Sequence, residues 1–109
     1  MPKRPLTPEL LHLVAGRFKA LSEPARLQIL QCLRGGERTV TELVEDTGLG
    51  QANLSRHLRL LDSLGFVSRR KEGLFAYYAL ADARVFQLCD IMCGQLEADA
   101  RVRARALAR

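Results

Sequence analysis

Residues 39–62 read TVTELVEDTGLGQANLSRHLRLLD, and their spacing predicts two short helices joined by a tight turn. Thr39 and Glu42 match a capping box, in which each side chain accepts a hydrogen bond from the other residue's backbone amide. Gly48 can adopt the left-handed backbone conformation that commonly ends a helix. This order of elements is typical of a helix-turn-helix.

The second helix of this pair has two different faces. Leu54, Leu58 and Leu61 form an apolar stripe that predicts burial. The other side carries donors and acceptors that suit base edges and phosphates in a DNA major groove. The residues predicted to bind DNA are Gln51, Asn53, Ser55, Arg56 and Arg59. A solvated helix face has the same composition, so the surrounding chain must decide between the two interpretations.

A β-hairpin is predicted directly after this helix. Residues 66–70 and 74–80 are two β-prone runs, and Lys71, Glu72 and Gly73 lie between them as a bend. Alternation assigns Leu74, Ala76, Tyr78 and Leu80 to the core face. The expected tip carries Arg69, Arg70 and Lys71, which suits a wing that binds phosphates beside the recognition helix.

The remaining chain predicts three more helices and no second domain. Two helices, at about residues 8–21 and 23–34, precede the helix-turn-helix, and the last begins near Asp82 as its cap. The predicted fold is mainly α with a small β-hairpin: a winged helix-turn-helix of five helices and a two-stranded wing. The expected division is a flexible N-terminal arm (1–7), a DNA-binding and dimerisation domain (8–100) and an Arg-rich tail (101–109).

Composition favours a dimer with a polyanionic partner. The 109 residues carry a net charge of +5 and a pI near 9.6. The last helix has a broad apolar stripe that one small domain cannot cover alone, which predicts packing against a second copy: Val85, Phe86, Cys89, Met92, Cys93 and Leu96. No apolar run is long enough to span a membrane and the chain begins without a signal peptide, so we expect a cytoplasmic protein.

The order of these elements resembles the ArsR/SmtB family of small bacterial repressors over residues 14–96. The resemblance is carried by ALSEPARLQIL (20–30), the pair Glu42–Leu43, QANLSRHL (51–58), and RKEG (70–73) followed by YYAL (77–80). It implies a winged-helix homodimer, joined largely through its first and last helices, that binds a roughly palindromic operator. An inducer bound elsewhere on the protein would lower DNA affinity and allow transcription.

Two metal sites known in the family have no counterpart here. Metal-sensing members carry a Cys-Val-Cys pattern on the first helix of the helix-turn-helix, where this chain has Thr39 and Thr41. Zinc sensors use Asp and His residues on the last helix. Asp82 matches the first of these, whereas the later positions hold Arg84, which cannot bind a metal, and then Gln95 and Ala98.

The cysteines leave the inducer open. Cys89 and Cys93 are one helical turn apart, so both sulfurs could reach arsenite, a soft metal ion or an oxidant. Some family members sense persulfides through a cysteine on the second helix. Cys32 lies one position away from that place, which turns it toward the core. The alternative is that all three cysteines serve only as small apolar side chains.

The leading hypothesis is therefore a homodimeric, sequence-specific transcriptional repressor, released from its operator by an inducer that Cys89 and Cys93 sense. One alternative is a winged-helix module that binds another protein rather than DNA. Another is a repressor of this type whose cysteines are structural. An enzyme is not expected, because the sequence contains no catalytic triad, phosphate-binding loop or paired acids.

Overall fold

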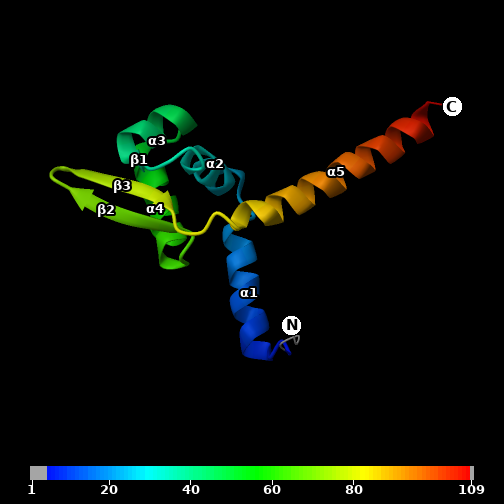
Figure 1. The fold of residues 1–109 in the computed structure, drawn as a ribbon, viewed down its shortest axis with the longest axis horizontal. Helices are drawn as coiled ribbons and strands as arrows, with labels where there is room; N and C mark the ends of the chain where they lie inside the picture. Colours follow the sequence, from blue (N-terminus) through cyan, green and yellow to red (C-terminus); the bar gives the residue numbers. More distant parts are fainter. Residues whose placement is uncertain (1–4, 109) are drawn as a thin grey trace.

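The computed structural model describes residues 5–108, which form five helices and one three-stranded antiparallel sheet (Figure 1). The helices are α1 (Pro8–Ala20), α2 (Pro24–Leu33), α3 (Val40–Thr47), α4 (Gln51–Ser63) and α5 (Val85–Leu107). The strands are β1 (Arg38–Thr39), β2 (Val67–Glu72) and β3 (Phe75–Leu80), in the order β1-β3-β2. The winged helix-turn-helix prediction is confirmed: α3 and α4 are the helix-turn-helix, and β2 and β3 are the wing.

The hydrophobic core lies where α2, α3 and α4 meet the sheet. Leu54, Leu58 and Leu61 of α4 are fully buried, as their spacing predicted. They pack with apolar side chains from the other elements, namely Ile29, Leu30, Leu33, Leu43, Val67, Tyr78, Val85 and Phe86. Because α4 buries its leucine stripe here, its polar side faces outward.

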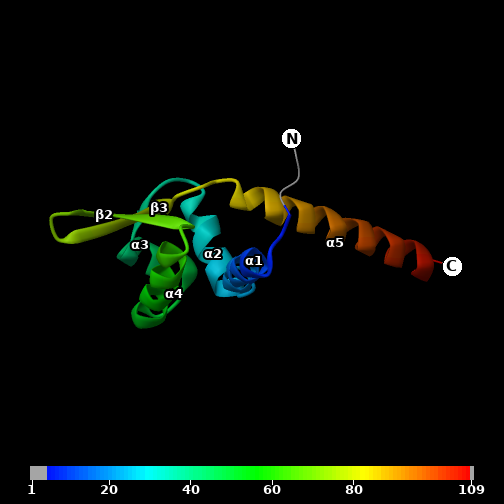
Figure 2. The ribbon, with the colours of Figure 1, turned by 90° about the horizontal axis from the view of Figure 1, so that it is seen from below.

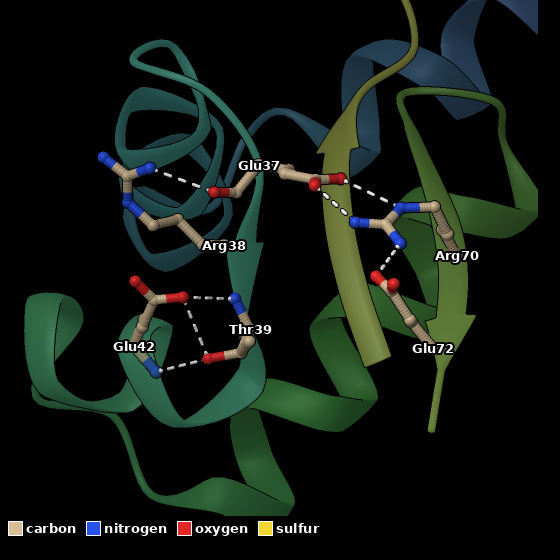
Figure 3. Close-up of polar contacts among 6 residues, drawn as sticks. All are labelled: Glu37, Arg38, Thr39, Glu42, Arg70 and Glu72. Carbon is tan, nitrogen blue, oxygen red and sulfur yellow. Dashed lines mark hydrogen bonds and ion pairs between the residues drawn. The ribbon is translucent and has the colours of Figure 1, made fainter. Parts of the chain in front are cut away.

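The start of α3 is fixed by the predicted capping box (Figure 3). The Glu42 amide donates to Thr39 Oγ1 at 3.2 Å, and the Thr39 amide donates to Glu42 Oε1 at 3.0 Å. The hydrogen bond from the Thr39 backbone, aided by the one from its hydroxyl, lowers the pKa of Glu42. Gly48 ends α3 with a φ of 73°, which glycine adopts without strain. These local contacts set the orientation of α3 ahead of α4.

We expect Thr39→Ala to reduce the free energy of unfolding by about 1 kcal/mol, because a helix amide loses its capping oxygen. Urea denaturation at neutral pH measures the change. Thr39→Ser is the matched control, since it keeps the hydroxyl, and it should retain most of the stability. Equal stability of the alanine variant and the wild type would contradict a capping role for Thr39.

The sheet differs from the prediction at two places. The prediction of two strands was incomplete: β1 adds a third, with Arg38 opposite Tyr78 and Thr39 opposite Tyr77. The assignment of Leu74 to the core face was also wrong. Strand β2 extends to Glu72, so the hairpin loop is formed by Gly73 and Leu74. Leu74 is 97% exposed. Tyr78 is buried, and Ala76 and Leu80 pack against the core as predicted.

The last helix begins later than predicted and is continuous. Asp82 does not cap it: Arg84 occupies the cap position, and the Asp82 carboxylate accepts a hydrogen bond from the Arg84 amide at 2.9 Å. The helix runs unbroken across position 100, where the sequence suggested that a tail begins. Residues 1–4 of the expected arm and Arg109 of the tail lie outside the described residues, and the division into arm, domain and tail stays a prediction.

Helices α1 and α5 project from the body formed by α2–α4 and the sheet (Figure 1). From Asp90 to Ala108 every residue is exposed. Between α1, α2 and α5 lies an apolar hollow of about 400 Å³, the α1–α5 groove, lined by Phe18, Leu21, Leu27, Leu88, Cys89, Met92, Cys93 and Leu96. Within residues 5–108, no helix combines the length and apolar character needed to cross a membrane.

Candidate nucleic-acid interface

The outer side of α4 carries all five residues predicted to read or anchor DNA from this helix. Gln51, Arg56 and Arg59 are exposed, while Asn53 and Ser55 are half-buried at its margins. Figure 2 shows α4 below the sheet, with the β2–β3 hairpin extending sideways beyond it. The fold therefore presents a polar helix face and a protruding hairpin next to each other.

Arg56 and Asn53 interact along α4. Arg56 Nη2 donates to Asn53 Oδ1 at 2.7 Å, which holds the guanidinium along the helix surface. This bond uses one of the five N–H groups of arginine, so Arg56 retains donors for a base or a phosphate. The pair is typical of a preorganised contact surface, since its side chains lose less freedom on binding.

A contact that the sequence did not reveal holds α4 against α2. Arg26 Nε donates to the Ala20 carbonyl at 2.6 Å, and its Nη1 lies 3.3 Å from Nδ1 of His57 on α4. Beside this contact is a hollow of about 440 Å³ lined by Glu23, Ala25, Arg26, Asn53, Arg56, His57 and Leu60. Arg26 thus links the end of α1 to the recognition helix. No periodicity signals a contact between residues so far apart in sequence.

The cationic residues of the wing do not gather at its tip, contrary to the prediction. They lie along β2, with Arg69 opposite Tyr78, Arg70 opposite Tyr77 and Lys71 opposite Ala76. Directly opposed residues of an antiparallel pair share a face, and successive residues alternate. Arg69 and Lys71 therefore lie on the face of the buried Tyr78, whereas Arg70 lies on the opposite face.

Arg70 is surrounded by acidic groups (Figure 3). Its Nη2 and Nε lie 2.6 and 3.4 Å from the two Glu37 carboxylate oxygens, and its Nη1 lies 2.5 Å from Glu72 Oε2. Its guanidinium carbon also lies 4.5 Å from the centre of the Tyr77 ring. The hydrogen bonds to Glu37 and then to Glu72 raise the pKa of Arg70 above its usual value.

Known proteins are similar to this chain in sequence. The sequence model of the family described as "Bacterial regulatory protein, arsR family" matches residues 23–69. The regulator NmtR of Mycobacterium tuberculosis is 40% identical over 89 residues, which cover 82% of this chain and 74% of that protein. The chain belongs to the ArsR family. Its relatives carry the names of transcriptional regulators, a class without enzymatic activity.

Two further relatives add detail. A probable mercury resistance operon repressor of Streptomyces lividans is 44% identical over 71 residues, and the match spans 65% of this chain and 57% of that repressor. The homodimeric winged helix-turn-helix DNA-binding domain Mb0332 of Mycobacterium bovis has a TM-score of 0.72 and 36% identity. That match covers 92% of this chain and 91% of the solved domain.

Asp82, the residue that matched a zinc ligand in the sequence comparison with the family, forms an ion pair with Arg84. Arg84 Nη2 donates to Asp82 Oδ2 at 2.7 Å, and Arg84 Nε lies within 3.1 Å of both carboxylate oxygens. These side-chain hydrogen bonds, together with one from the Arg84 amide, lower the pKa of Asp82 to about 2. Across residues 5–108, no three His, Cys, Asp or Glu side chains form a cluster that could hold a metal ion.

The three cysteines of this ArsR protein lie in two different environments. Cys89 is half-buried and Cys93 is exposed, and both line the α1–α5 groove. Cys32 and Cys89 both pack against the core, but Cys32 lies outside the groove, and burial, followed by the charge of Asp46, raises the pKa of its thiol. A raised pKa reduces the fraction of reactive thiolate, so the setting of Cys32 is typical of a packing residue.

Proposed function

We propose that this ArsR protein is a homodimeric repressor that binds operator DNA sequence-specifically in the bacterial cytoplasm. The observation that carries the proposal is the outward face of α4, where Arg56, Arg59 and Gln51 stand exposed beside a cationic strand. Arginine and glutamine pair with guanine and adenine edges in the major groove. The solved relative named as a homodimeric DNA-binding domain supports the same activity here.

In the proposed dimer, α1 and α5 of two copies pack together. Large apolar side chains of both helices are exposed in the single chain, among them Phe18, Leu88, Ile91, Met92 and Leu96. An exposed apolar surface of this kind is typical of a protein–protein interface. Pairing would cover it and set the two α4 helices about 34 Å apart, the spacing of successive major grooves on one side of the duplex.

A gel-shift titration with promoter DNA from the protein's own operon tests the repressor proposal. We expect binding at least 1,000-fold tighter than to random duplex at about 0.15 M salt, in the range of specific regulators. Repeating the titration at a second salt concentration separates base recognition from phosphate attraction, since only the latter weakens steeply with salt. Equal affinity for promoter and random duplex would contradict the proposal.

The proposed signal acts through Cys89 and Cys93. Two thiols one helical turn apart suit a soft ion or metalloid such as arsenite, because such species prefer sulfur ligands. The name of the Streptomyces relative, a mercury resistance repressor, supports a soft ligand. Two cysteines do not supply the four ligands of a structural zinc site. A ligand held here would alter the packing of α5 and so bias the dimer toward a geometry with lower DNA affinity.

We expect arsenite, Hg²⁺ or peroxide to lower operator affinity by about 5- to 150-fold, the usual range of allosteric coupling. Cys89→Ser and Cys93→Ser should each abolish the response while leaving basal DNA binding intact. Cys32→Ser is the matched control and should respond like the wild type. Fluorescence anisotropy with labelled operator measures all four proteins. Unchanged binding after every treatment would mean that the cysteines only pack.

A further inference from the structure

The wing has two faces of different charge. Arg69 and Lys71 lie on the face shared with Val67 and Tyr78, where no acidic residue of β2 or β3 accompanies them. The opposite face carries Arg70 together with Glu72, and Glu37 reaches it from the residue before β1. The first face thus contributes two positive charges, whereas the cluster of Arg70, Glu37 and Glu72 is net negative by one.

Arg70 reaches across the whole sheet. The strand order is β1-β3-β2, so Tyr77 of β3 lies between Thr39 of β1 and Arg70 of β2. The Arg70 side chain covers the Tyr77 ring and meets the Glu37 carboxylate on the far side. Thr39 is also the residue that caps α3. Arg70 therefore connects the wing to the segment from which the helix-turn-helix begins.

We propose that Arg70 is a positioning residue that holds the wing against β1, and that Arg69 and Lys71 are the wing's phosphate-binding residues. The wing then meets DNA with the face that carries Arg69 and Lys71, and the Glu37–Arg70–Glu72 cluster points away from the duplex. This assignment of roles rests on the proposed DNA-binding function. The assignment gives different roles to three neighbouring cationic residues that the sequence alone does not distinguish.

The charges favour this division of roles. To bind a phosphate with all of its donors, Arg70 would have to leave Glu37 and Glu72, which occupy three of its five N–H groups. Each of these exposed contacts is weak alone, but a network of several is stronger than an isolated pair. The two released carboxylates would also lie close to the phosphate and repel it. Neither obstacle applies to Arg69 and Lys71, since their side chains make no hydrogen bond or ion pair in the part of the chain described here.

The first experiment measures thermal unfolding without DNA at fixed protein concentration. Arg70→Ala and Glu37→Ala should each lower Tm by about 2–4 °C, as expected for loss of an exposed ion pair in a domain of this size. The double variant should fall little further than Arg70→Ala alone, because that variant already removes the contact with Glu37. Additive decreases, or no decrease, would overturn the positioning role. Since no DNA is present, this result does not depend on the proposed function.

The second experiment measures operator affinity as a function of salt concentration. Arg69→Ala and Lys71→Ala should each flatten the slope of log K against log salt by about 1.8, because a dimer loses two phosphate contacts at about 0.9 each. Unchanged slopes for both would overturn their assignment. Arg70→Ala and Glu37→Ala should both weaken binding, by about 2- to 5-fold, because each removes the contact between the wing and the residue before β1.

Glu37→Ala gives the decisive comparison. A positioning role and a phosphate-binding role of Arg70 predict opposite changes in operator affinity for this variant. If Arg70 bound a phosphate, removing Glu37 would free it and tighten operator binding, which would overturn the proposal. Glu45→Ala is the matched control, since it removes an exposed carboxylate from α3 that makes no ion pair among the described residues. The Glu45→Ala variant measures how operator affinity changes when any one negative charge is removed. If even the wild type prefers no promoter duplex, the proposed function fails, while the thermal experiment still tests the Arg70 contact.

Discussion

Replacing both Arg56 and Arg59 by alanine is expected to weaken operator binding by at least 100-fold while leaving the fold intact. Both side chains are exposed on α4, so their removal creates no cavity in the core. A well-placed arginine contact to a base is worth about 1–3 kcal/mol, and a dimer would lose four arginines at once. Fluorescence anisotropy at about 0.15 M salt measures the affinity, and circular dichroism verifies the fold.

The matched control is Arg101→Ala combined with Arg103→Ala, which removes the same charge from the exposed outer part of α5. It should change operator affinity by only a few-fold, because these arginines act at long range and salt screens them. Equal losses in both double variants would mean that α4 contributes charge alone and no sequence recognition. Retained binding in the α4 variant would instead favour a module that contacts another protein.

Replacing Leu96 by glutamate is expected to convert the dimer to monomers and to lower operator affinity by about 100- to 10,000-fold. Leu96 lines the α1–α5 groove and is 67% exposed in the single chain, so a carboxylate there leaves the core undisturbed. In the proposed interface the same carboxylate would be buried without a partner, which is unfavourable. The loss of affinity follows because a monomer engages one half-site and loses the gain from linked binding.

Sedimentation velocity measures the oligomeric state of this variant, and the anisotropy assay measures its DNA binding. Leu107→Glu is the control, since it places the same charge at the end of α5, outside the groove and at a site that is 84% exposed. It should remain dimeric. A Leu96→Glu protein that also sediments as a dimer would remove α5 from the proposed interface.

Features that depend on neighbouring residues were predictable from the sequence. The capping box joins Thr39 to Glu42, Gly48 ends α3 by its own backbone freedom, and the leucines of α4 repeat at helical spacing. Each signal lies within a few residues, where periodicity and capping rules apply. For this reason the helix-turn-helix and the outward face of α4 followed from the sequence alone.

Features that depend on distant residues were not predictable in the same way. Strand β1 has two residues, too few to show an alternating pattern, and it exists because it pairs with β3. Leu74 has the composition of a strand residue, but the register of β2 places it in the loop. Arg70 looks like its cationic neighbours until the fold brings Glu37, 33 positions away, into contact. Such contacts arise only when the topology is known.

The exposure of the outer half of α5 bears on how fast unpaired subunits are degraded in the cell. Every residue from Asp90 to Ala108 is exposed in the single chain, so this part of α5 has little tertiary packing to stabilise it. In the proposed dimer the second subunit covers the apolar side chains of α5 beside the α1–α5 groove, such as Met92 and Leu96. We therefore expect proteases to cut α5 faster in an unpaired subunit than in a dimer. Such turnover would remove unpaired subunits first and leave the dimers, which are the form proposed to occupy an operator.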